Sequence, residues 1–166
     1  MEMQKQQTIT VIGCGNPYAA DDAAGIAVVE GLRKAAPEGL CLRLMDDLGP
    51  GFLCDFASQG SIVILVDAVR SAAEIGTVHF LRLPPETVVS RSVQRISTHS
   101  LGLETEIQLA SRFGKCTEVF LLGIEIGDHS SGENLSPAVS AAIEKAVSDF
   151  NYFCRCARLQ CHPGLT

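Results

Sequence analysis

The architecture of this chain can be worked out from residues 8–36, TITVIGCGNPYAADDAAGIAVVEGLRKAA. The first six of these residues are rich in β-branched side chains and end in glycine, which predicts a strand at residues 8–13. Residues 22–36 are predicted to form a helix, because their apolar side chains recur every three positions and so share one face. These apolar residues are Ala23, Ile26, Val29 and Leu32.

The same alternation of strand and helix continues along the chain. Further strands are expected at residues 40–45, 61–66, 77–83 and 117–124, and helices at residues 51–58, 100–113 and 136–150. The strand at 61–66 is nearly all apolar, which is typical of a strand buried on both faces of a parallel sheet. Ser136 and Pro137 suit the start of the last helix, and Val139, Ile143, Val147 and Phe150 form its expected buried stripe. This alternation predicts an α/β fold, a three-layer α/β/α sandwich around a mostly parallel, twisted sheet of about five strands.

Length and composition predict one globular domain. The chain has 166 residues, of which 46% are hydrophobic and 19% are charged, so a buried core is expected and a disordered chain is not. We expect a single α/β domain at residues 1–150 and a C-terminal tail at residues 151–166 with no assigned role. In that tail Cys154, Cys156, Cys161 and His162 lack the paired spacing of a strong zinc site, so a frayed segment with incidental thiols is favoured over a metal site.

Charge and cysteine content indicate the partners and the compartment. The net charge of −6 and the absence of a basic stripe argue against nucleic acid as a partner. Residues 1–7 lack the apolar stretch of a signal peptide, and the apolar runs are too short to span a bilayer. The seven cysteines, an odd number, suit a reducing compartment. We therefore expect a cytoplasmic protein, a monomer, with no membrane partner.

Acidic residues follow four of the expected strands. They are Asp21 and Asp22 after the first strand, Asp46 and Asp47 after the second, Asp67 after the third and Glu125 after the last. His99 precedes the helix expected at residue 100. Ligands of α/β sheets bind outside the carboxyl ends of the strands, where these side chains would meet. A group of carboxylates repels itself unless a cation is bound, and carboxylates with an imidazole suit a divalent metal.

Each of these residues also has a structural interpretation. Asp21 and Asp22 would lie in the first turn of a helix, where the helix dipole favours acidic side chains. Asp46 can cap a turn, and His99 can be a surface residue at a helix start. Asp67 is the hardest to explain in this way, because it ends a buried apolar strand where an unpaired carboxylate is costly. From the residues alone, a metal or acid site and a structural role remain equally open.

The turn at residues 13–16, GCGN, has the first two glycines of a dinucleotide-binding fingerprint. The third glycine would fall at Tyr18, so the fingerprint is incomplete. A tight turn that needs glycine for its backbone angles is the alternative interpretation.

Taken together, four motifs resemble those of the hydrogenase maturation protease family, over about residues 8–150. They are GCGN at 13–16 followed by DDAAG at 21–25, ILVDA at 64–68, STHSLGL at 97–103 and LSPAV at 135–139. The resemblance implies an endopeptidase that removes a C-terminal peptide from the nickel-loaded precursor of a nickel-iron hydrogenase large subunit. That precursor is therefore the expected partner.

The resemblance also implies the site. Asp22, Asp67 and His99 would be metal ligands that sense nickel carried by the substrate, and another divalent metal could take this place in the isolated protein. Asp46 matches a further acid of the family and could orient water or accept a proton, so these four are the candidate catalytic residues. The family usually continues the acid at 46 with paired glycines and a threonine, whereas this chain has DDLGPG at 46–51, which leaves its contacts with the substrate tail open.

Two alternatives remain at this point. A nickel-sensing chaperone of the same precursor would use the same ligands without cleavage. A nucleotide- or phosphate-binding α/β module would use the glycine turn before the helix, although the acidic residues around that turn would repel phosphate.

Overall fold

The computed structural model describes residues 8–45, 51–56, 60–83, 103–113, 118–127 and 134–160. The expectations for Asp46, Asp47 and His99 fall outside these residues. The strands are β1 (Ile9–Cys14), β2 (Leu40–Met45), β3 (Ile62–Val69), β4 (Val78–Leu83) and β5 (Glu118–Glu125). The helices are the 3-10 turn η1 (Ala20–Ala23), α1 (Ala24–Ala35), α2 (Phe52–Phe56), α3 (Leu103–Arg112), α4 (Pro137–Ser148) and α5 (Phe150–Gln160).

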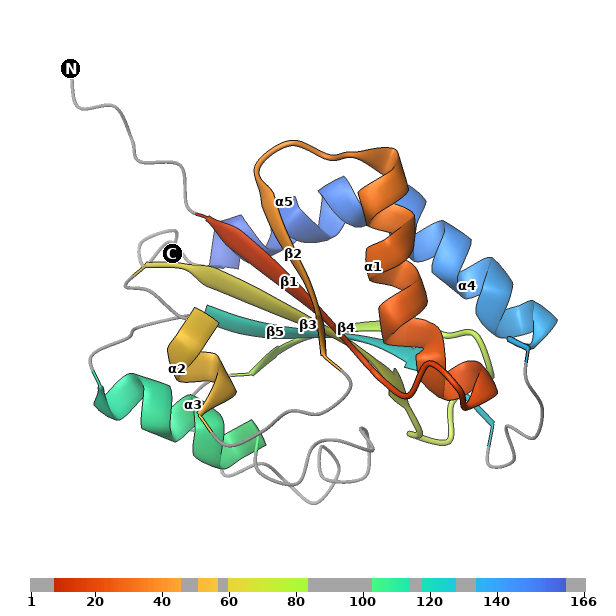
Figure 1. Cartoon of the computed structure of the whole chain (residues 1–166), viewed down its shortest axis with the longest axis horizontal. Coiled ribbons are helices and arrows are strands. Elements are labelled where there is room, and N and C mark those ends of the chain that lie inside the picture. The colour runs from red at the N-terminus through yellow and green to blue at the C-terminus, as the bar shows by residue number, and fades with distance from the viewer. Residues whose placement is uncertain are drawn as a thin grey trace.

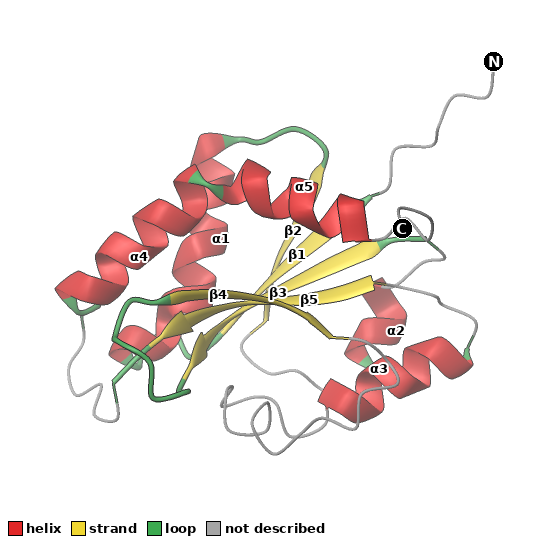
Figure 2. Cartoon of the chain, turned by 180° about the vertical axis from the view of Figure 1, so that it is seen from behind, coloured by secondary structure: helices red, strands yellow, loops and turns green. Residues whose placement is uncertain are grey.

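The five strands form one sheet in the order β2-β1-β3-β5-β4. Strands β1, β2, β3 and β5 run parallel, and β4 pairs antiparallel with β5 at the edge. Helices α1, α4 and α5 cover one face of the sheet, and α2 and α3 cover the other (Figure 1; Figure 2). The expected three-layer α/β/α sandwich is confirmed.

Strand β3 is the centre of the core, and all eight of its residues are buried. Its side chains alternate between the two faces, as the two-residue period of a strand requires. Ile64 and Val66 pack with α1 and α4, whereas Val63 and Leu65 pack with α2 and α3. The expectation of a strand buried on both faces is confirmed. By the same alternation Asp67 belongs to the α2 and α3 face.

The buried face of α1 was predicted correctly only in part. Val29 and Leu32 are buried, but Ala23 and Ile26 are only partly buried, and Val28 takes a place in the core. The α-helix begins two residues later than expected, at Ala24, because the preceding residues form the 3-10 turn η1. This start and the close packing of the helix against the strand ends fix the rotation of α1.

The frayed tail expected at residues 151–166 is wrong for residues 151–160. These residues belong to α5, and its Phe150, Cys154 and Ala157 are buried in the same core as α4. The ring of Phe153 packs against Phe80 with 5.1 Å between centroids. The reason is their spacing, because residues 150, 154 and 157 recur at helical intervals and present one apolar face.

The helix expected at residues 136–150 is α4, which ends at Ser148. A separate helix, α5, begins at Phe150. Val139 and Ile143 are buried as expected, while Val147 is only partly buried.

No helix among the described residues has the length and apolar character needed to cross a membrane.

Candidate functional site

The sheet order creates a switch point between β1 and β3. From β1 the chain moves to β2 on one side, and it then crosses to β3 on the other. The register pairs Gly13 with Val66, so the carboxyl ends of the two strands lie side by side. Binding sites of open α/β sheets form where the connections diverge in this way. Asp22 and Asp67 both lie at the carboxyl ends of these two strands.

Glycines bring the start of α1 directly against the strand ends. A Cβ atom on Gly25 would collide with the backbone carbonyl oxygens of Val66 and Cys14, and one on Gly13 would lie 2.5 Å from the carbonyl oxygen of Gly25. Gly15 has a φ of +138°, which favours glycine. The glycines of the turn are therefore required by packing and backbone geometry. This close approach places η1 in contact with β3.

Asp22 lies in η1 and is half-buried. Its Oδ2 accepts a hydrogen bond of 3.2 Å from the backbone N–H of Asn16. The side chain of Asn16 in turn accepts the N–H of Tyr18 at 3.0 Å through Oδ1. The carboxylate is thus held at the carboxyl end of the sheet by the loop that follows β1. Asn16, which donates to it, is exposed to solvent.

Asp67 is a buried carboxylate near the end of β3, with a side chain only 2% exposed. Its Oδ1 accepts a 2.9 Å hydrogen bond from the N–H of Ala68. The pKa of the Cys14 thiol is raised far above its ordinary value, mainly because the thiol is buried and also because of the negative charge of Asp67. Because the thiolate is the reactive form, Cys14 is not suited to be a nucleophile.

The adjacent acid Asp21 has a different partner. It is buried, and its Oδ1 accepts a 2.6 Å hydrogen bond from the backbone N–H of Ser136, the N-cap residue of α4. Ser136 occupies the expected capping position, but its side chain makes no capping hydrogen bond. The structural interpretation is therefore the better one for Asp21, which joins η1 to the start of α4.

Glu125 at the end of β5 is also engaged in a local cluster. It accepts hydrogen bonds from the N–H and the hydroxyl of Ser71, both at 2.7 Å, and lies 3.0 Å from Nε2 of His79. Burial favours the neutral acid, but the bonds from Ser71 and the pairing with His79 outweigh it and lower the pKa of Glu125. In the register of the sheet, Gly123 lies between Asp67 on β3 and His79 on β4. The side chain of Val69 packs over Gly123.

Sequence reasoning missed Ser71 and His79 as partners of Glu125. Only the antiparallel pairing of β4 with β5 brings His79 to that carboxylate, and no local pattern in the sequence signals it. Among the described residues, no group of three His, Cys, Asp or Glu side chains is arranged to hold a metal ion. The coordination expected of Asp22 and Asp67 with His99, and the role of Asp46, stay predictions.

A family model described as hydrogenase maturation protease matches residues 26–150. The chain belongs to this family. The match includes Asp67, while Asp22 lies just before it. The protein is therefore a peptidase, a hydrolase of polypeptide substrates. Family membership gives no support to the nucleotide-binding alternative.

Individual relatives agree with this assignment. The chain is 31% identical over 144 residues to the hydrogenase expression/formation protein HoxM of Azotobacter vinelandii, covering 84% of this chain and 68% of that protein. It is 29% identical to the hydrogenase 2 maturation protease of Escherichia coli K12, covering 84% and 85%. The fold matches the hydrogenase maturating endopeptidase HybD of E. coli with a TM-score of 0.71 and 25% identity, over 90% of this chain and 93% of that one.

Proposed function

We propose that this peptidase removes a C-terminal peptide from the nickel-loaded precursor of a nickel-iron hydrogenase large subunit. In this proposal the nickel is part of the substrate, and Asp22, Asp67 and His99 bind it. The observation that supports the proposal most directly is the pair of carboxylates at the switch point. Asp22 reaches that edge because Gly25 packs against the ends of β1 and β3, and Asp67 is buried there on the central strand.

The donor set fits the chemistry of nickel. Carboxylate oxygens and an imidazole nitrogen are ligands for divalent first-row metals, and three of them leave positions open for groups of the precursor. Binding the precursor's nickel would fix the position of its C-terminal segment relative to the protease. The same metal could polarise the scissile carbonyl or activate water, and Asp46 would orient that water or accept its proton. The proposed chemistry is an aspartyl-type hydrolysis, and the raised pKa of the buried Cys14 thiol argues against a cysteine nucleophile.

We also propose that the protease acts as a monomer in the cytoplasm. The cytoplasmic location is supported by the cysteines: no disulfide joins the five that the structure describes, as is usual in a reducing compartment.

The decisive experiment is intact-mass analysis of a nickel-loaded large-subunit precursor before and after incubation with the protein. We expect the loss of one C-terminal peptide with nickel-loaded precursor and no loss with nickel-free precursor. His99→Ala and Asp67→Asn should abolish the mass change, whereas Glu144→Gln, an exposed residue of α4, should leave it intact.

An uncut precursor that nevertheless binds the wild-type protein would contradict the cleavage step. It would leave the nickel-sensing chaperone as the explanation. Cleavage that is equally fast without nickel would instead contradict the sensing role of the three ligands.

A further inference from the structure

The loop between β1 and η1 exposes an aromatic side chain beside the candidate site. Tyr18 is 89% exposed, the most exposed large apolar side chain among the described residues. A single exposed apolar residue is common on protein surfaces and needs no explanation by itself. The conformation of this loop and its place in the molecule distinguish Tyr18 from such residues.

The backbone around Tyr18 is held by hydrogen bonds on both sides. Its own N–H donates to Oδ1 of Asn16 at 3.0 Å, and the N–H of Ala19 donates to the Asn16 carbonyl at 3.1 Å. The N–H of Asp22 donates to the Ala19 carbonyl at 2.9 Å, and the Asp22 carboxylate accepts the N–H of Asn16. The backbone that carries the exposed ring is therefore tied to the Asp22 carboxylate through Asn16.

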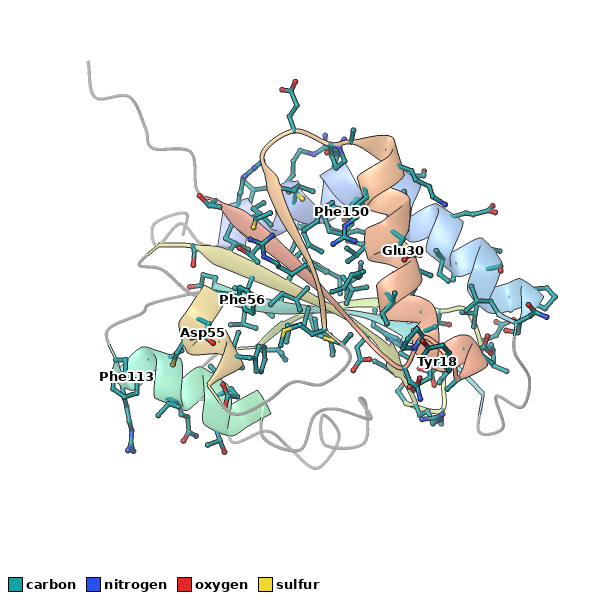
Figure 3. The ribbon with its side chains drawn as sticks, viewed as in Figure 1. Tyr18, Glu30, Asp55, Phe56, Phe113 and Phe150 are labelled. Carbon is teal, nitrogen blue, oxygen red and sulfur yellow. The ribbon has the colours of Figure 1, made fainter. Side chains whose placement is uncertain are left out.

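Tyr18 also lies at the functional end of the sheet. Figure 3 shows it near the start of α1, beside the carboxyl ends of the strands, whereas the exposed Phe113 lies at the opposite end of the molecule. The hydrogen bond from Ser136 to Asp21 brings the exposed Pro137 to the same edge. A polypeptide that reaches Asp22 therefore meets this aromatic ring next to the site.

We propose that Tyr18 is a substrate-positioning residue, which packs against the precursor segment next to the scissile bond. Tyrosine is enriched at protein interfaces because its ring buries a large apolar area while its hydroxyl stays hydrated, and few rotatable bonds are lost. The preformed loop reduces the cost of ordering further. This inference rests on the proposed function, since the occupant is the precursor on which the peptidase acts.

The chain offers a matched control, because its only other tyrosine, Tyr152, is 57% exposed on α5. We would measure cleavage kinetics and the dissociation constant for the nickel-loaded precursor with wild type, Tyr18→Ala, Tyr18→Phe and Tyr152→Ala. Tyr18→Ala should raise KM and the dissociation constant about tenfold, with kcat within about twofold, as for a moderate interface anchor. Tyr18→Phe and Tyr152→Ala should match wild type in these constants, and the Tyr18 variants should keep the melting temperature of wild type because the Tyr18 ring is exposed.

An unchanged KM and dissociation constant for Tyr18→Ala would overturn the inference while leaving the proposed function in place. An equal loss with Tyr152→Ala would overturn it too, because the effect would not be specific to the site. If wild type fails to cut the precursor, the proposed function fails. Tyr18 is then judged on the dissociation constants alone, where equal values for wild type and Tyr18→Ala count against it.

Discussion

The carboxylate of Asp21 accepts a 2.6 Å hydrogen bond from the backbone N–H of Ser136, a residue 115 positions away in the sequence. The bond connects η1, which also holds Asp22, to the first turn of α4. Two adjacent acids of one turn are thus divided between two tasks. Asp21 fixes the helix start, and Asp22 bonds the loop after β1.

Loss of this link should reduce stability. Asp21→Ala removes the buried carboxylate that accepts the hydrogen bond from Ser136. We therefore expect the free energy of unfolding to fall by about 1.5–3 kcal/mol. Urea denaturation monitored by circular dichroism measures the change. Asp22→Asn keeps an oxygen that can accept the Asn16 N–H and should cost less than Asp21→Ala. A smaller loss for Asp21→Ala than for Asp22→Asn would contradict the division of tasks.

Asp22→Asn and Asp67→Asn should abolish most of the activity without unfolding the protein. Each replaces a carboxylate by an amide of the same shape, which removes the negative charge that the proposed nickel contact needs. We expect kcat/KM for the nickel-loaded precursor to fall by about 100-fold or more, because a metal contact contributes several kcal/mol. Wild-type rates in both variants, with melting temperatures near that of wild type, would refute the assignment of these two ligands.

Gly25→Ala should be strongly destabilising. The new methyl group would meet the backbone carbonyls of Val66 and Cys14, which cannot move aside without shifting the sheet. We expect a loss of about 1–3 kcal/mol or more. Gly31→Ala in the same helix is the matched control, because its methyl would meet only a side-chain methyl of Val147, 2.8 Å away, and both changes gain the same helix propensity. Equal losses in chemical denaturation would show that the strand contact is not what requires glycine.

Glu125 should give the folded protein a measurable sensitivity to acid. Its pKa is lower in the folded protein than in the unfolded chain, so the unfolded chain takes up a proton first as the pH falls. The stabilisation that the Glu125 carboxylate provides is complete above its pKa in the unfolded chain, which is about 4.3. It is lost as the pH falls through the pKa of Glu125 in the folded protein. The difference in unfolding free energy between wild type and Glu125→Gln should therefore narrow from pH 6 to pH 3.

Urea titrations at several pH values check this narrowing. Glu144→Gln, a change at an exposed residue of α4, should alter stability by no more than about 0.5 kcal/mol throughout. A difference for Glu125→Gln that stays constant from pH 6 to pH 3 would contradict the lowered pKa of the buried carboxylate.

The sequence by itself determined the layers of the fold and two of the candidate ligands. A β-branched run predicted β1, the three-residue recurrence of apolar side chains predicted α1, and a continuous apolar run predicted β3, because these patterns depend only on near neighbours in the chain. Asp67 was singled out because a carboxylate on a buried strand is costly, and Asp21 and Asp22 because they follow the turn after β1. The choice of Asp22 over Asp21 came from the family resemblance. The four motifs then indicated the family to which the chain belongs.

Only the tertiary structure decided which partners these residues have. Asp21 and Asp22 are equivalent in the sequence, and they differ because α4 packs on one side of η1 and offers Asp21 a backbone N–H. Glu125 finds His79 only because β4 pairs with β5 at the edge of the sheet. The helical spacing of residues 150, 154 and 157 makes an apolar face, but that face joins the core only because α5 turns back over the sheet. Such contacts join residues far apart in the chain, so they depend on the order of the strands rather than on any local pattern.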